Sequence, residues 1–147
     1  MFKPINIFLI FCIIASRLLP HPPNFTPVIA VFMFGTMINL VPLLLAYMFT
    51  DMLIGFHPYM LWVYSSLLLI GLVRFNPLFS SIVFFLITNF GVWVSGVYGL
   101  NLQGLLTTYT LGIPFFANTL LSTVIFYYLI KKSIEFSSKT YNFSLSH

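Results

Sequence analysis

Asp51 and Arg17 are the residues whose chemistry is most unusual for their surroundings. Asp51 is the only acid within the apolar part of the chain, and Arg17 is the cation expected nearest to it in depth. An ionised side chain in a bilayer costs about 2.5 kcal/mol or more unless it is paired or faces water. Two compatible interpretations follow: the side chains form a structural ion pair, or they line the rim of an outward-facing cavity.

Amide, imidazole and aromatic side chains form a second group that could bind a ligand. Asn89 and Trp93 are four residues apart, so on a helix they share one face and could present an amide and an indole N–H together. Asn89 could instead bond to a neighbouring helix, an interaction worth about 0.6 kcal/mol in membranes. Trp93 could instead be an interfacial anchor. The predicted substrate-binding residues are Arg17, His21, Asn24, Asp51, His57, Asn89, Trp93, Tyr109 and Asn118.

Motifs for metal binding and catalysis are missing from the sequence. His21 and His57 would need a third ligand to hold a metal, and no close histidine spacing supports one, so we predict no metal site. The single cysteine, Cys12, cannot form an intrachain disulfide. Without a His-Glu-x-x-His pair or a nucleophile with its base, we expect no enzyme and no cofactor. The chain also has no phosphate-binding glycine loop, so any ATP hydrolysis would occur in a partner.

The composition is typical of an integral membrane protein. Of 147 residues, 60% are hydrophobic and 5% are charged, against about a quarter charged in soluble domains. Residues 18–50, 52–73 and 75–130 contain no Lys, Arg, Asp or Glu, and each run reaches the roughly 20 residues that cross a bilayer. The net charge of +4 forms no basic face, which argues against nucleic acid as a partner. We predict an all-α polytopic membrane protein with about six transmembrane helices.

Prolines and glycines divide this chain into its predicted helices. Four prolines between Pro20 and Pro27 forbid a helix there. We expect Pro27 to begin a short helix with Thr26 as its N-cap, and Asn39 and Pro42 to interrupt it. The predicted helices span Ile5–Leu19, Pro27–Ile38, Val41–Phe56, Pro58–Phe75, Pro77–Gly96 and Pro114–Lys132, with a short interfacial or re-entrant helix at Leu102–Leu111.

The distribution of positive charge predicts the topology. With both termini in the cytoplasm, only Arg17 lies outside, and the positive-inside rule is satisfied by Lys3, Arg74, Lys131, Lys132 and Lys139. The unusual polar residues then gather toward the outer side, while the inner halves of the helices are apolar. Residues 1–135 are predicted to form one membrane-embedded bundle. The serine-rich segment 136–147 is predicted to be a disordered cytoplasmic tail.

Four stretches carry a resemblance to a known family. The segments Arg17–Pro27, Asp51–His57, Phe84–Trp93 and Pro114–Thr119 resemble a family of small, largely uncharacterised bacterial membrane proteins regarded as transporters. That family in turn resembles the substrate-binding S components of energy-coupling factor transporters. S components are bundles of about six helices that capture a vitamin or related micronutrient and dock on a membrane coupling subunit with two ATPases.

The resemblance implies a location, a function and partners. It implies a multi-pass protein of the bacterial inner membrane that captures a small, vitamin-like molecule from outside and works with a coupling subunit and ABC-type ATPases. It also implies that the ligand is surrounded by Arg17, Asn24, Asp51, Asn89, Trp93 and Asn118. The alternative function is an accessory or assembly subunit of a larger membrane complex, in which the polar residues only hold helices together.

Overall fold

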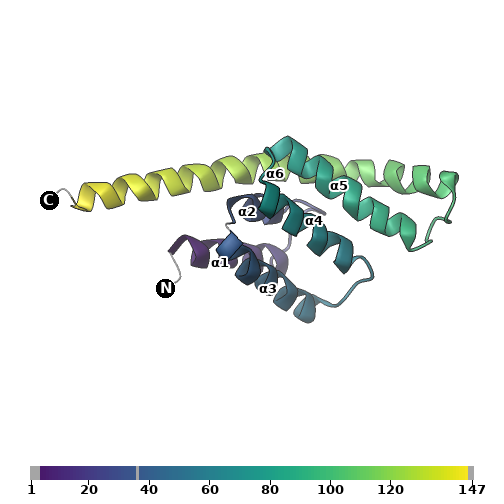
Figure 1. Ribbon diagram of the computed structural model, residues 1–147, viewed down its shortest axis with the longest axis horizontal. Coiled ribbons are helices and arrows are strands. Elements are labelled where there is room, and N and C mark those ends of the chain that lie inside the picture. The colour runs from purple at the N-terminus through teal and green to yellow at the C-terminus, as the bar shows by residue number, and fades with distance from the viewer. Residues whose placement is uncertain (1–3, 36, 146–147) are drawn as a thin grey trace.

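The protein is all-helical, as the sequence predicts (Figure 1). The computed structural model describes residues 4–35 and 37–145, and no strand occurs among them. Lys3 and residues 146–147 lie outside the described residues. The helices are α1 (Pro4–Leu18), α2 (Val28–Phe34), α3 (Met37–Ile54), α4 (Met60–Val73), α5 (Pro77–Val94) and α6 (Leu102–Leu145).

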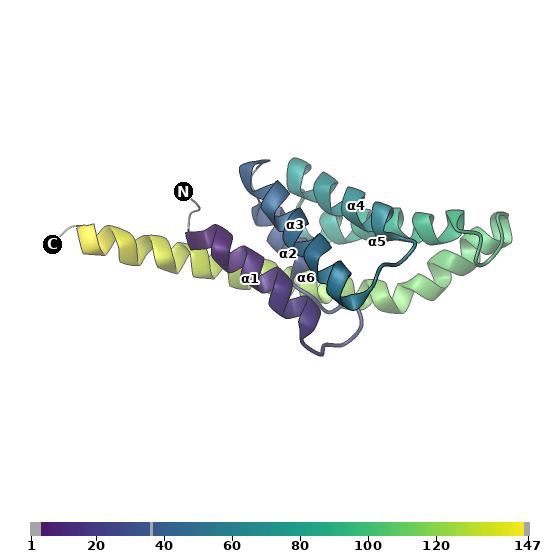
Figure 2. The same cartoon turned by 90° about the horizontal axis from the view of Figure 1, so that it is seen from below.

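The long helix α6 runs along one side of the bundle. The first half of α6 pairs with α5, which packs in turn on α4, while α1 packs on α3 (Figures 1 and 2). The C-terminal part of α6 reaches beyond the other helices. Both termini lie at the same end of the molecule (Figure 2).

The short helix α2 forms the centre of the core. Every residue from Val28 to Met33 is buried, and α2 contacts α1, α4, α5 and α6. A helix of 7 residues that is apolar on all sides must be covered by other helices, because it has no polar face for water. Since 7 residues extend only about 10 Å, α2 cannot cross a bilayer of about 30 Å by itself.

The ends of α2 differ from the sequence-based expectation. Pro27 occupies the N-cap position, and Thr26 provides no cap. The helix ends at Phe34 because Gly35 adopts an extended conformation, with φ −60° and ψ 140°. The expected interruption at Asn39 and Pro42 is therefore wrong: α3 begins at Met37 and continues through both residues.

The largest difference concerns the last third of the chain. The short helix expected at Leu102–Leu111 and the span expected from Pro114 form one continuous helix, α6, with Pro114 inside it. A proline in a helix removes one hydrogen bond, but α5 packs along this stretch and holds its path. The segment 136–147, expected to be disordered, is helical through Leu145.

Close approach of α5 to both α6 and α4 depends on glycine. A Cβ at Gly112 would lie 2.5 Å from Asn89 Oδ1, and a Cβ at Gly91 would lie 2.3 Å from the Trp62 side chain on α4. The 95–101 turn between α5 and α6 has positive φ at Gly96 and Gly99, a conformation that glycine adopts without strain.

Two helices in the described part of the chain are long and apolar enough to cross a membrane. These helices are α5 and the Leu102–Ser137 portion of α6. Three shorter apolar helices accompany them, at Ile5–Leu18, Leu40–Ile54 and Met60–Val73.

Substitution of Gly104 by alanine tests the packing of the turn on α6. The new Cβ would lie 2.0 Å from the carbonyl oxygen of Gly99 and 2.4 Å from that of Tyr98. Backbone atoms cannot move aside as a side chain can, so we expect a loss of about 3 kcal/mol, the upper end of typical overpacking costs. The measurement is the Tm of the purified protein in detergent. The control, Gln103→Ala, changes an exposed neighbour and should leave the Tm unchanged; an unchanged Tm for Gly104→Ala would contradict the packing described here.

Candidate functional site

Arg17 and Asp51 are joined in one hydrogen-bonded cluster with Tyr47 and Tyr64. The Arg17 guanidinium forms an ion pair with Asp51 Oδ1 and donates a hydrogen bond of 2.6 Å to the Tyr47 hydroxyl. The Tyr64 hydroxyl donates to the other carboxylate oxygen of Asp51 at 2.5 Å. The cluster therefore links the C-terminal end of α1 with α3 and α4.

The positions of these four side chains follow from helix geometry, the helix dipole and ring packing. Tyr47 and Asp51 are four residues apart and share one face of α3. Arg17 lies in the last turn of α1, where a cation is favoured by the helix dipole. The Tyr47 and Tyr64 rings pack edge to face, with centroids 5.8 Å apart. Asp51 is 0% exposed and the Arg17 side chain 16% exposed, so each charge depends on the other for compensation.

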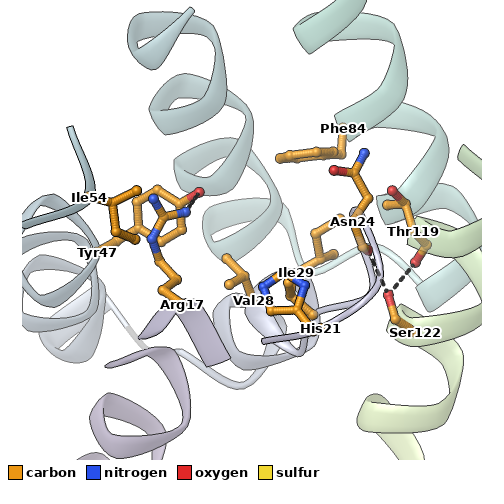
Figure 3. A pocket seen from close by; sticks show the side chains of 11 residues that line it. Arg17, His21, Asn24, Val28, Ile29, Tyr47, Ile54, Phe84, Thr119 and Ser122 are labelled. Atoms are coloured by element: carbon orange, nitrogen blue, oxygen red, sulfur yellow. Dashed lines mark hydrogen bonds between the residues drawn. The ribbon is translucent and has the colours of Figure 1, made fainter. Parts of the chain in front are cut away.

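A cavity of about 300 Å³ borders this cluster (Figure 3). Arg17 and Tyr47 lie on one side of it, while Asn24, Thr119 and Ser122 lie on the opposite side. Thr119 and Ser122 are 4% and 1% exposed, so α6 presents two buried hydroxyl groups to this space. The remaining lining residues are His21, Thr26, Val28, Ile29, Ile54 and Phe84.

A second cavity, of about 530 Å³, adjoins the first. Four residues line both, so the two cavities share a wall: Asn24, Tyr47, Phe84 and Thr119. The lining of the second cavity is rich in Phe and Tyr, and it also contains the side chains of His57, Thr88 and Asn89. Size and lining are those of a small-molecule pocket, in which apolar walls surround a few polar groups.

The connector between α1 and α2 forms one wall of the first cavity and is fastened to α6. Asn118 Nδ2 donates to the carbonyl of Pro23 at 3.0 Å, and the Ser122 hydroxyl lies 3.4 Å from the carbonyl of Asn24. The ring of Phe25 packs edge to face on Phe126 of α6. Asn24 has a φ of 60°, a left-handed conformation that asparagine tolerates better than most residues.

Several polar groups at the cavities already have a partner, and others do not. Thr119 Oγ1 donates to the carbonyl of Phe115, and Asn89 Nδ2 donates to the carbonyl of Phe85, which leaves both side-chain oxygens as acceptors. Arg17 Nε is buried and makes no hydrogen bond to the described residues. The site therefore retains acceptor oxygens on Thr119 and Asn89.

The structure brings five of the nine predicted site residues to the cavity walls. These residues are Arg17, His21, Asn24, His57 and Asn89. Asp51 lines neither cavity. Its carboxylate pairs with Arg17, which agrees with the interpretation of these two residues as a structural ion pair.

The other three predicted residues line neither cavity and bond to backbone carbonyls. Trp93 Nε1 donates to the carbonyl of Asn101, and the Tyr109 hydroxyl donates to the carbonyl of Leu86. Asn118 bonds to the connector. The i, i+4 spacing of Asn89 and Trp93 therefore does not place both at one cavity.

Sequence reasoning missed Tyr47, Phe84, Thr119 and Ser122. Each has a residue type that is common in membrane helices, so only its position in the fold distinguishes it. One signal was present in the sequence: Tyr47 is one helical turn before Asp51 and could be expected to share its face.

Substitution of Asp51 by alanine tests the buried cluster. It leaves the Arg17 charge without compensation and the Tyr64 hydroxyl without its acceptor, so we expect a loss of roughly 3 kcal/mol. Tyr64→Phe removes one hydrogen bond to a charged group and should cost less, about 1.5 kcal/mol. The control is Tyr128→Phe at an exposed position on α6, and the measurement is the Tm of each variant in detergent. Equal Tm values for all three would show that the cluster does not stabilise the bundle.

Comparison with known proteins assigns the chain to a family. No curated protein and no solved structure matches it. A family model matches residues 3–144, and its description is "Family of unknown function (DUF6580)". Since the match covers nearly the whole sequence, the chain belongs to this family of unknown function, DUF6580.

Proposed function

We propose that this protein is a membrane-embedded subunit that captures a small metabolite from outside the cell for uptake. The observation that carries the proposal is the pair of adjoining cavities, of about 300 and 530 Å³, built from every helical layer of the bundle. Their lining residues come from the end of α1, the connector, the 55–59 loop and the facing stretches of α5 and α6.

The surface of the helices supports insertion of the whole bundle in a bilayer. In the most apolar 18-residue stretch of each helix, only 17% of the residues of α5 and 22% of those of α6 are buried within the molecule. Large apolar side chains on these faces, such as Leu106, Leu121 and Leu129 on α6, are exposed. A lipid environment would cover them, whereas water would not. The shorter helices α1, α3 and α4 would require a thinned bilayer or shielding by neighbours.

The direction of the helices and the positive charges support two cytoplasmic termini. Consecutive long helices are joined by short connections, and the start of α1 lies on the same side of the molecule as the projecting C-terminal part of α6 (Figures 1 and 2). Arg74 follows α4, and Lys131 and Lys132 lie in the C-terminal half of α6. Cytoplasmic termini keep these three cations inside, in agreement with the positive-inside rule.

The resemblance to S components supplies the proposed mechanism of uptake. The chain would bind its substrate at the cavities and deliver it together with a coupling membrane subunit and ABC-type ATPases, since it has no phosphate-binding loop of its own. This protein would therefore contribute recognition rather than chemistry.

A second candidate is an accessory or assembly subunit of a larger membrane complex. The C-terminal part of α6 favours it, because this part extends beyond the other helices and exposes Phe136. A single helix that projects in this way could contact another subunit. Such a subunit would co-purify with a fixed partner and would need no ligand in the cavities.

Substitution of Asn24 by glycine tests the binding site. Glycine keeps the positive φ of this position and removes an amide that lines both cavities. We expect native mass spectrometry of the gently extracted protein to show a retained small molecule in the wild type, with at least about tenfold lower occupancy in the variant, a loss of about 1.4 kcal/mol.

The matched control is Arg74→Gly. Arg74 is the other described residue besides glycine with a positive φ, and it lies outside both cavities. Its variant should retain the molecule at wild-type occupancy. A wild-type protein that carries no small molecule, but does carry a protein partner, would favour the assembly subunit.

Cysteine labelling tests the topology. In a Cys12→Ser background, we expect Ser95→Cys in the 95–101 turn to react with a membrane-impermeant maleimide on intact cells, because this turn would face outward. Ser133→Cys on α6 should react only after the cells are permeabilised. Both positions are exposed in the structure, so the difference reports the side of the membrane. The reverse labelling pattern would overturn the proposed orientation.

A further inference from the structure

The charge balance of the cavities constrains the ligand, given that the proposed function is correct. Among the described residues that line them, Arg17 is the one with a permanent charge, and Asp51 compensates it in an ion pair. The walls therefore have no net charge to offer a ligand. A charged ligand would bring an uncompensated charge into a site of low dielectric constant, which is strongly unfavourable.

His57 bonds to the backbone through one ring nitrogen. Its Nδ1 accepts a hydrogen bond from the backbone N–H of Tyr59 at 3.3 Å. Nε2 is therefore the ring nitrogen that can donate to a ligand.

His21 has the opposite arrangement. Its Nδ1 lies 2.9 Å from the carbonyl oxygen of Pro22. A carbonyl can only accept, so Nδ1 donates to it and Nε2 is the ring nitrogen left for a ligand. The two histidines thus add two hydrogen-bonding nitrogens to the site.

The rest of the walls combines aromatic area with unused hydrogen-bonding groups. Six aromatic side chains line the larger cavity: Tyr47, Tyr59, Phe84, Phe85, Phe115 and Phe116. The smaller cavity is lined by Arg17, whose guanidinium carries N–H donors, and by Thr119, whose Oγ1 can accept. Asn24 lies between Phe84 and Thr119 (Figure 3) and contributes an amide at the junction.

We propose that the site binds an aromatic compound without net charge that bears a carboxamide or similar group with both a donor and an acceptor. The aromatic ring occupies the larger cavity, where it packs against the phenylalanine and tyrosine rings. The polar group extends past Asn24 into the smaller cavity, where the Arg17 guanidinium donates to its oxygen and the Thr119 hydroxyl accepts from its N–H. Neutral walls then discriminate against carboxylates and amines of the same shape.

Three probes that share an indole ring test this inference. The full chain, in lipid nanodiscs, is titrated with indole-3-acetamide, indole-3-acetate and tryptamine, which are neutral, anionic and cationic at neutral pH. Isothermal titration calorimetry gives each Kd. We expect the amide to bind at least about tenfold more tightly than either ion. Equal or tighter binding of either ion, or no binding of any probe, would overturn the inference.

Two substitutions change the charge of the site in opposite directions. Asp51→Asn removes the charge that compensates Arg17 and should shift the preference toward indole-3-acetate. Asn24→Asp adds a negative charge at the junction, at an exposed position where aspartate tolerates the positive φ, and should shift it toward tryptamine. If Asp51→Asn fails to fold, Asn24→Asp still tests the inference. An unchanged preference in a folded variant would contradict control of specificity by charge.

Failure of this inference can be distinguished from failure of the proposed function. A retained molecule in native mass spectrometry that carries a net charge at neutral pH overturns the neutral-ligand inference and leaves substrate capture intact. A wild-type protein with no retained molecule, no response to the three probes and a fixed protein partner overturns both.

Discussion

Compensation of two charges inside an apolar bundle is the constraint on which the rest of this structure depends. Asp51 is completely buried, and both of its oxygens are occupied, one by Arg17 and the other by Tyr64. Because an unpaired carboxylate there would be strongly destabilising, the end of α1, the C-terminal part of α3 and the start of α4 must meet at one point. This requirement sets the spacing of three helices and leaves Arg17 at the edge of the cavities.

The cavities exist because the helices around them cannot close completely. α2 has only 7 residues, so the extended connector before it, rather than another helical turn, forms the adjacent wall. Asn118 and Ser122 fasten that connector to α6. On the far side, Gly112 lets α5 and α6 approach until Asn89 and Phe85 lie against the helix backbone. The extended connector on one side and the closely packed pair α5 and α6 on the other enclose cavities with both polar and aromatic surfaces.

Local sequence signals predict the helices well where local backbone geometry alone determines the end of a helix. Pro77 begins α5, with Asn76 as its N-cap, because proline suits the first turn and lacks only a donor that would be unsatisfied there. The same signal is misleading at Pro42 and Pro114, which lie inside helices. Packing of neighbouring helices compensates the lost hydrogen bond at such positions, and packing cannot be seen in a local pattern.

The sequence alone determined an all-helical chain, the connector that cannot be helical and the scarcity of charge in its apolar runs, since these depend on composition and on proline geometry. Only the tertiary structure decided which polar residues line the same cavity. Trp93 and Asn118 turn to backbone carbonyls, whereas Thr119 and Tyr47 join the cavity walls. The physical reason is that a side chain's role depends on which helix lies opposite it, and that arrangement results from long-range packing and from the buried Arg17–Asp51 ion pair.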